Sequence, residues 1–559
     1  MTLVKGLVAA AVGTCAVALL AALPARQVLL PASGPKPVRG VMHIHTRDSD
    51  GTGTVDDVAA AAARAGLSFV VITDHGDATR LPPPSYRSGV LCISATEVST
   101  FTGHVIALGM PQAPFPLAGE PRDVIDDIHR LGGLAIVAHP HSKKLDLRWS
   151  DLDAPFDGIE WLNADSEWRD ERLLDLVRVL STYWFRAPEA LATMLDRTNE
   201  TLQLWDQVSK TRPVVGVAGS DAHARLGEDR IYLRLPSYEA IFRTFSLAVT
   251  GVSLRGDAVA DADAVIRAIR AGHVYSAIDG LATPAHLEFS AERAGARVDA
   301  GERLGAGGPV TFTVRTNAPS DAAVTLVGNG RRIAAGRAPV FSHTEPAPAG
   351  AYRVEVTLNG VGGEPPVPWV VSNPIYVGTT ARTIGAEAAP TDARFLYRNG
   401  PAAEWTVEHS PRARGAVSVI GAVGGTQVLF RFALGGSTAE SPFVALAMPA
   451  GSDVTGHDRL AFSGRANRPM RVSVQLRATR GGTEHRWRRS VYLDEEARLV
   501  TLPLSDFRPT TPATPAAVDL PAVTSILFVV DQVNTKLGTS GQIWLDDVRY
   551  QREGTTSGR

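Results

Sequence analysis

Five short motifs of histidine and acid lie between residues 43 and 223, each beside a short apolar run. In chain order they are His43-Ile-His45 with Asp50, Asp74-His75, Glu97 with His104, His139-Pro-His141 and Asp221-Ala-His223. Each run has the length of a β-strand, and residues i and i+2 of a strand point to the same face. Loops that follow parallel strands all open on the same end of a barrel, so the five motifs are expected to lie together there.

The same region alternates strand-like runs with helical patterns. Residues 38–45 and 67–75 predict strands, and between them Thr54 starts a helix that Gly66 ends. Residues 121–133 predict a second helix, with proline at its start and glycine at its end. This alternation predicts a parallel α/β sheet closed into a TIM-like barrel over residues 39–290.

A mostly helical insert, residues 164–212, interrupts this domain and holds Trp168, Trp184 and Trp205. Two interpretations of these tryptophans stay open. They form the core of a helical hairpin, or they form a lid or apolar wall over a site.

The chain beyond residue 290 changes to alternating strand patterns separated by Gly, Pro and Asn. Residues 291–378 predict a small β-sandwich, and a linker rich in Thr, Ala and Pro covers 379–392. Residues 393–552 predict a larger, jelly-roll-like β-sandwich, and 553–559 predict a disordered tail. The expected whole is therefore an α/β domain followed by two all-β domains.

The first 38 residues predict a signal peptide or membrane anchor with a linker. Lys5 precedes an uninterrupted apolar run, Gly6–Leu23, which ends at Pro24. This is the pattern of a secretory signal peptide, and the run is also just long enough to span a membrane. We expect an exported protein, periplasmic or extracellular, which residues 6–23 would anchor if they are retained.

The composition of the chain limits which partners it can bind and which side chains can be metal ligands. Lys and Arg total 56 against 58 Asp and Glu, so no overall basic field attracts nucleic acid, and membrane contact is expected only through the N-terminal segment. The two cysteines, Cys15 and Cys92, exclude a disulfide scaffold and a Cys-rich zinc fold. Metal ligands must then be His, Asp and Glu, and the imidazoles and carboxylates of the five motifs need partners that metal ions provide. His129, in the middle of the second predicted helix, is interpreted as structural or surface.

These motifs resemble those of the polymerase and histidinol phosphatase (PHP) superfamily. The matching segments are HIHTRDSDG, ITDHG, Glu97 with GHV, AHPH and GSDAH, and the segments IEWLN and PWVVSNPIYV further resemble its carbaryl-hydrolase-like branch. The resemblance covers residues 39–290 well and 291–378 moderately. It implies a distorted (β/α)7 barrel that binds up to three divalent cations. The implied ligands are His43, His45, Asp50, His75, Glu97, His104, His139, Asp221 and His223, whereas His141 and Glu160 stand where relatives vary.

The expected activity is a metal-dependent phosphoesterase. Ligands of nitrogen and oxygen suit two or three ions of Mn, Zn or Fe. Glu97 would bridge two ions, and a water between them would be the nucleophile. Asp221, His223 and His141 are the catalytic candidates for proton transfer. Two alternatives stay open: a carbamate, ester or amide hydrolase at the same site, or a non-catalytic exported binding protein. The C-terminal sandwich loosely resembles carbohydrate-binding jelly rolls, so contact with a glycan or surface is a further hypothesis.

Overall fold

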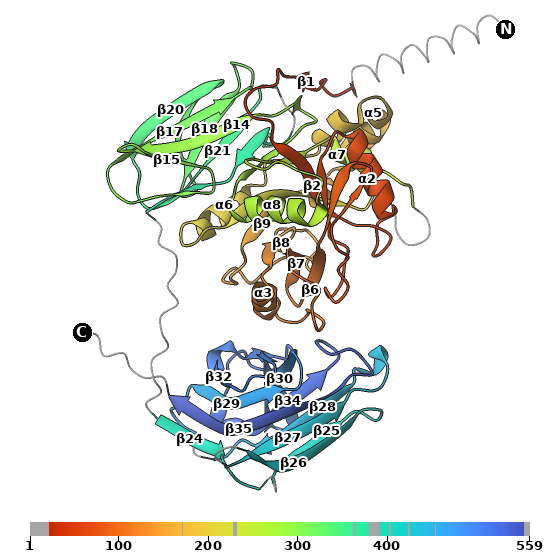
Figure 1. Cartoon of the computed structure of the whole chain (residues 1–559), viewed down its shortest axis with the longest axis vertical. Helices are drawn as coiled ribbons and strands as arrows, with labels where there is room; N and C mark the ends of the chain where they lie inside the picture. The colour runs from red at the N-terminus through yellow and green to blue at the C-terminus, as the bar shows by residue number, and fades with distance from the viewer. Residues whose placement is uncertain are drawn as a thin grey trace, which may run out of the picture. The chain divides into compact units, whose positions relative to one another are not determined.

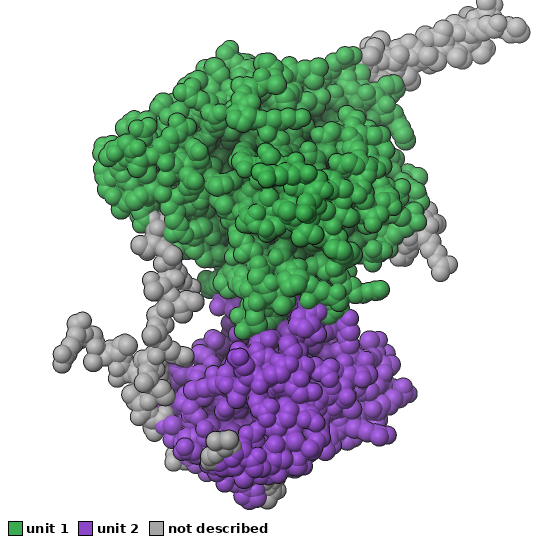
Figure 2. Space-filling view, viewed as in Figure 1, with its two compact units in different colours: residues 1–112, 124–382 green, residues 113–123, 383–559 purple. Residues whose placement is uncertain are grey.

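The computed structural model describes residues 22–169, 171–226, 232–360, 363, 365–378, 392–401, 404–422, 425–452 and 454–552. The chain divides into two compact units (Figure 2), residues 1–112 with 124–382 and residues 113–123 with 383–559. Most of the expected N-terminal signal or anchor, nearly all of the linker and the C-terminal tail lie outside the described residues. Within the described ranges, no helix combines the length and apolar character needed to cross a membrane.

The first part of the chain, up to residue 286, folds into short strands and seven helices in the described ranges (Figure 1). The strands are β1 (Val28–Leu29), β2 (Val38–Ile44), β3 (Phe69–Ile72), β4 (Ser85–Arg87), β5 (Val90–Ser94), β6 (Thr96–Thr100), β7 (Gly103–Leu108), β8 (Leu134–Val137), β9 (Gly158–Asn163), β10 (Val215–Ala222), β11 (Ser246–Val249), β12 (Val274–Ala277) and β13 (Ala282–Thr283). The helices are α2 (Val55–Arg64), α3 (Pro121–Arg130), α4 (Ala164–Arg169), α5 (Leu173–Ala192), α6 (Asn199–Ser209), α7 (Tyr238–Phe242) and α8 (Ala258–Arg270).

Strands β1 and β13 pair with each other in a separate two-stranded sheet, and the other strands join a closed sheet of mixed direction. The pairs β2–β3, β3–β5, β8–β9, β9–β10 and β10–β2 are parallel. The pairs β6–β7, β7–β8, β11–β2 and β11–β12 are antiparallel. Strands of the following segment continue the same sheet, because β22 (Val370–Ser372) pairs with β12.

The expectation of a distorted (β/α)7, TIM-like barrel is wrong. Strands account for 43% of the structure and helices for 17%, so the protein is mostly β. A two-residue turn at Phe101 and Thr102 joins β6 directly to β7, where a (β/α) repeat would place a helix. The error has a physical cause, because a short run buried on both faces has the same apolar pattern in a parallel and an antiparallel sheet.

The helix starts follow local capping chemistry. At the start of α2, the Thr54 hydroxyl accepts from the Asp57 amide, and the Asp57 carboxylate accepts from the Thr54 amide in return. This capping box satisfies two amides that would otherwise lack partners, and such a cap contributes about 1 kcal/mol. The helix ends before Gly66, whose φ of 73° suits glycine.

Residues 287–377, where a small β-sandwich over 291–378 was predicted, form two layers of strands. The remaining strands of this segment are β14 (Leu287–Arg293), β15 (Ala296–Asp299), β16 (Arg303–Leu304), β17 (Pro309–Thr316), β18 (Ala323–Gly328), β19 (Arg331–Arg337), β20 (Val340–Pro346), β21 (Gly350–Thr357) and β23 (Ile375–Val377). One layer is the sheet β15-β14-β17-β20, and the other layer belongs to the closed sheet. Phe289, Phe312 and Trp369 are among the buried side chains of the core that they share.

The second unit is a sandwich of two antiparallel sheets. Its strands are β24 (Asp392–Tyr397), β25 (Thr406–His409), β26 (Arg414–Ala422), β27 (Gly425–Ala433), β28 (Phe443–Pro449), β29 (Arg459–Ala466), β30 (Met470–Arg480), β31 (Thr483–Leu493), β32 (Arg498–Pro503), β33 (Arg508–Pro509), β34 (Val523–Asp531) and β35 (Ser540–Arg552). One sheet has the order β26-β27-β35-β29-β32, with β24 also on β35, and the other has the order β25-β28-β34-β30-β31-β33.

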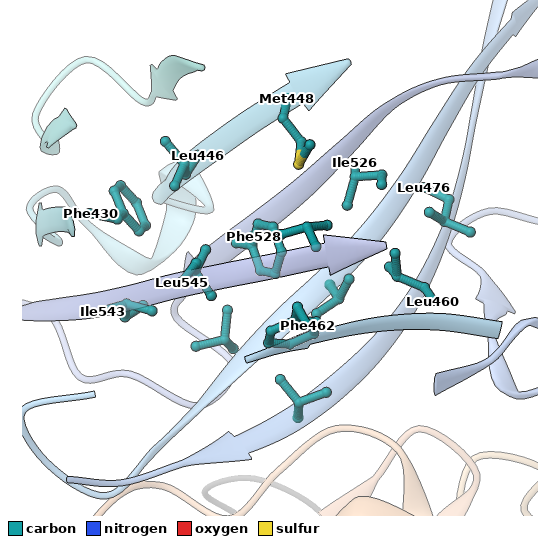
Figure 3. Close-up of a cluster of buried hydrophobic side chains, with 14 of the residues drawn as sticks. Phe430, Leu446, Met448, Leu460, Phe462, Leu476, Ile526, Phe528, Ile543 and Leu545 are labelled. Atoms are coloured by element: carbon teal, nitrogen blue, oxygen red, sulfur yellow. The ribbon is translucent and has the colours of Figure 1, made fainter. Parts of the chain in front are cut away.

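Period-two alternation explains this sandwich. In β29, Leu460 and Phe462 point inward, and in β34 Ile526 and Phe528 do the same across the core (Figure 3). The rings of Phe462 and Phe528 meet edge to face at 5.1 Å. Each such buried side chain contributes roughly 1.5–3 kcal/mol, and the β-sandwich expected here is confirmed.

Candidate metal centre

The strand ends of the first unit bring the five motifs together. His43 is in β2 and His45 directly follows it, while His75 stands three residues beyond β3. Glu97 is in β6, and His75 and Glu97 form an isolated β-bridge. The remaining motif residues stand at the start of β7, just after β8, and at and after the end of β10; they are His104, His139, Asp221 and His223.

Glu97 lies at the middle of the cluster. Its Oε1 atom is 2.7 Å from Nδ1 of His104 and 2.8 Å from Nε2 of His139. Its Oε2 atom is 3.2 Å from each of three imidazole nitrogens, those of His43, His45 and His75. One buried carboxylate therefore faces five imidazoles with its two oxygens.

The ligand atoms form three overlapping groups, each spanning no more than 4.8 Å. The groups are His43, His45, Glu97 and Asp221; His75, Glu97 and His104; and His45, Asp50, His75 and His223. The third group is more open to solvent, because the Asp50 side chain is 45% exposed while its Oδ2 atom lies 3.2 Å from Nε2 of His223. All nine implied ligands thus lie in this cluster, since His139 joins it through Glu97. These groups could hold metal ions.

Three buried atoms of the cluster lack a hydrogen-bond partner: Nε2 of His43, Nε2 of His45 and Oε2 of Glu97. Each of the two nitrogens lies 3.2 Å from Oε2 of Glu97 without hydrogen-bond geometry. An unsatisfied buried polar group costs about 1–3 kcal/mol, so three in one place are destabilising unless a ligand compensates them. Nitrogen and oxygen donors that converge in this way fit a divalent cation.

The backbone at three of these residues is held in an uncommon conformation. The φ angles are 62° at His43, 29° at His139 and 48° at Asp221. Positive φ in a residue other than glycine costs on the order of 1–3 kcal/mol and persists only where the surroundings fix it. At each position it directs a candidate ligand into the cluster.

Two residues of β9 support the cluster from behind. Glu160 accepts from Nδ1 of His43 at 2.6 Å and from the His139 amide at 2.9 Å. The side-chain amide of Asn163 donates to Glu160 at 2.9 Å and lies 3.5 Å from Asp221. Asn163 was not predicted from the sequence, although an acid and an amide at the end of an apolar strand run are a signal that could have found it.

Mutual charge controls protonation in the cation-free cluster. Burial would lower the pKa of His45, but the carboxylates of Asp221 and Glu97 raise it to about 10. Burial would likewise raise the pKa of Glu97, but His43, His104 and His139 lower it well below its usual range. The ionised carboxylate of Glu97 therefore pairs with a protonated His45 imidazole, whose proton a cation must displace, whereas burial lowers the pKa of His75.

The remaining sequence candidates stand outside these groups. His141 is half-buried and its Nδ1 atom lies 2.9 Å from the Thr201 hydroxyl on α6. Burial lowers the pKa of this imidazole. His129 pairs with Asp157 at 2.7 Å. Among the described residues, the structure places neither histidine in a metal-binding group.

An apolar pocket opens beside Asp221 and His223. Its volume is about 400 Å³, and the helical insert supplies most of its wall. The lining includes Trp168, Leu176, Val179, Tyr183 and Met194. Of the three tryptophans of the insert, Trp205 is a core residue whose indole donates to the Val214 carbonyl, Trp168 lines the pocket, and Trp184 is exposed.

Comparisons with known proteins give one relative in sequence and several in structure. No family model matches the chain, so the resemblance to the PHP superfamily rests on the motifs. An uncharacterized protein of Methanocaldococcus jannaschii is 32% identical over 142 residues, which are 22% of this chain and 80% of that protein.

The solved structures found by comparison include two carbohydrate-binding modules. A family 11 module of a Clostridium thermocellum cellulase is 14% identical, with a TM-score of 0.25, over 29% of this chain and 95% of that one. A family 30 module is 12% identical, with a TM-score of 0.23, over 29% and 99%. At these TM-scores the likeness supports no statement about sugar binding by this chain.

Proposed function

We propose that this chain, which belongs to the same family as the uncharacterized protein of Methanocaldococcus jannaschii, is a divalent-metal-dependent hydrolase. The observation that carries the proposal is the convergence of Glu97 Oε2 with Nε2 of His43 and His45, all buried and without hydrogen-bond partners. A structural cluster would satisfy these atoms internally, whereas a metal centre leaves lone pairs directed at one point.

Two or three ions fit the donor set. The group around Glu97 and Asp221 is fully buried, and the group around Asp50 and His223 borders solvent. Imidazole and carboxylate without thiolate suit Mn, Zn or Fe. When bound, such ions polarise the bond under attack and make water nucleophilic near neutral pH.

The protein groups around the ions would orient the substrate and handle protons. Asp221 contacts His43 and His45 at 3.3 and 3.1 Å and also lines the pocket, so its carboxylate stands between the metal cluster and the substrate space. His223 lines the same pocket. Its Nδ1 donates to the Asp221 carbonyl at 2.8 Å, which leaves Nε2 facing Asp50. We assign proton transfer to these two residues.

Two classes of substrate fit a hydrolase with this site. A phosphoester suits a multinuclear centre, because its oxygens take positive charge from several sides. The apolar pocket beside Asp221 and His223 favours the second class, a carbamate, carboxylic ester or amide with an aryl or alkyl group, because apolar walls stabilise such a group by burying it.

A screen of metal-reconstituted protein tests the proposal. The substrates are aryl phosphomonoesters, aryl phosphodiesters, aryl carbamates and aryl esters, each with Mn, Zn or Fe. We expect turnover in one class, and we expect the double variant His43→Ala with Asp221→Ala to abolish it while circular dichroism stays unchanged. His129→Ala is the control, because His129 pairs with Asp157 outside the metal-binding groups.

Other outcomes would contradict the proposal. Protein that takes up none of these metals has no metal centre. Protein that binds them stoichiometrically but turns over no substrate supports the remaining alternative, an exported binding protein. Export, and contact of the C-terminal unit with a glycan, stay predictions in either case.

A further inference from the structure

Helix α5 presents large apolar side chains to solvent. Leu173, Leu174 and Trp184 keep 75%, 80% and 74% of their surface exposed. We call the whole set the α5 stripe, and its members are Leu173, Leu174, Val177, Leu180, Trp184 and Phe185. The stripe ends at Arg186, where the helix bends.

The stripe is one continuous face of the helix. Residues 173, 177, 180 and 184 follow the spacing of four, three and four that places side chains on one side of a helix. The opposite side carries Val179, Thr182 and Tyr183, which are buried in the unit. Leu180 stands at the border of the two sides, because it also lines the pocket beside Asp221 and His223. The rest of the apolar face toward solvent is additional to the face that packs in the core.

The α5 stripe differs from the single exposed apolar residues found on most protein surfaces. Single exposed apolar residues, such as Val259 on α8 and Val340 on β20, are common on folded proteins and need no explanation. Six neighbouring residues on one helix form a contiguous patch of the kind that marks an interaction site.

The N-terminal apolar run reaches the folded unit at this same helix. Nε of Arg178 donates to the Ala22 carbonyl at 3.3 Å, and the Arg186 guanidinium donates to the Pro24 carbonyl. Ala22 belongs to the run Gly6–Leu23, and Pro24 follows it. The described end of the apolar run therefore lies at the same helix that carries the stripe.

We propose that the α5 stripe docks on the surface of a phospholipid bilayer. Leucine, tryptophan and phenylalanine on one helix face, with Arg172 and Arg178 beside them, are the composition of a helix that lies in the membrane interface. The sequence holds a second apolar element, the run Gly6–Leu23, whose described end at Ala22 contacts α5, and stable membrane attachment takes two such signals. This inference goes beyond the proposed hydrolase and does not depend on it.

Site-specific fluorescence on the full chain tests the proposal. In a Cys15→Ser background only buried Cys92 remains, so a single new cysteine can carry an environment-sensitive dye. The probe positions are Leu173→Cys and Trp184→Cys, and the control is Val259→Cys on α8, which is 63% exposed. The membrane probe is a vesicle of phosphatidylcholine and phosphatidylglycerol that carries a spin-labelled lipid.

We expect vesicles to shift the emission at positions 173 and 184 to the blue and the spin label to quench it, with neither effect at position 259. We also expect Leu173→Glu with Trp184→Glu to weaken vesicle binding at least tenfold, while Val259→Glu leaves it unchanged. Vesicles that carry the protein along without any shift at 173 or 184 would overturn the proposal, because the run alone would then hold the chain.

Two other results would also overturn it. A shift without vesicles that grows with protein concentration means that a second copy covers the stripe. A shift without vesicles that is independent of concentration means that the chain's own apolar run covers it.

Discussion

Gly219 lies against Glu160 so closely that a Cβ atom on it would stand 1.7 Å from Oε1 of the carboxylate. That carboxylate holds Nδ1 of His43 and the His139 amide. The absence of a side chain in β10 therefore sets the position of two candidate metal ligands through a residue of the neighbouring strand β9.

Gly219→Ala should consequently disturb the metal centre. The added methyl group must displace the Glu160 carboxylate, and overpacking of this kind costs about 1–3 kcal/mol of unfolding free energy. We expect lower metal occupancy by elemental analysis and a lower midpoint in urea. Gly305→Ala is the control, because a Cβ there meets open space. Equal metal content in the two variants would mean that Glu160 does not position the ligands.

The three metal-binding groups should respond differently to loss of a carboxylate. Glu97 belongs to two of them and Asp50 only to the third. Glu97→Gln is therefore expected to remove most bound metal, and Asp50→Asn to remove about one ion. Metal per chain after gel filtration measures both, with the exposed Asp56→Asn as a control. The same loss in both site variants would indicate a single cooperative centre.

Metal binding should release protons. The pKa of His45 is raised to about 10, because Asp221 and Glu97 outweigh its burial, so the imidazole is protonated at neutral pH in cation-free protein. A cation binds only neutral imidazole, so its apparent affinity rises as pH increases toward that pKa. Calorimetric titration with Zn or Mn in two buffers of different ionisation enthalpy should give different heats. Identical heats would contradict proton release.

A buried ion pair fastens α6 to the small sandwich. Arg353 on β21 is 1% exposed, and its guanidinium donates to both carboxylate oxygens of Asp206, at 2.7 and 2.8 Å. Arg353→Met leaves that carboxylate without its partner and should cost about 3–5 kcal/mol of unfolding free energy. Arg267→Met, at an exposed pair with Asp263, should change stability by less than about 1 kcal/mol. Chemical denaturation compares them, and similar losses would contradict this account.

The site was more accessible to sequence reasoning than the fold. His43 and His45 lie two residues apart where a strand ends, and this local spacing survives whatever the strand direction is. The direction of β7 and β11 depends instead on pairing between distant segments, which burial on both faces hides from any local pattern. Other features depend on β9 and β10 lying side by side, and the sequence alone does not show them. They are the hydrogen bond from Asn163 to Glu160 and the closeness of Gly219 to Glu160.

The side chain of Asn373 has a consequence for how the molecule can be divided. Its amide nitrogen donates to the carbonyls of Gly216 and Val274, and its oxygen accepts from the Gly216 amide. One residue between β22 and β23 thus completes the backbone bonding of β10 and β12. Strand β10, which carries Asp221, is therefore held by hydrogen bonds from a residue near the C-terminal end of the same unit. Cutting the chain near residue 290 would remove the hydrogen bonds that Asn373 makes to β10 and β12, so the small sandwich and the sheet that carries the candidate ligands are expected to unfold in one cooperative transition.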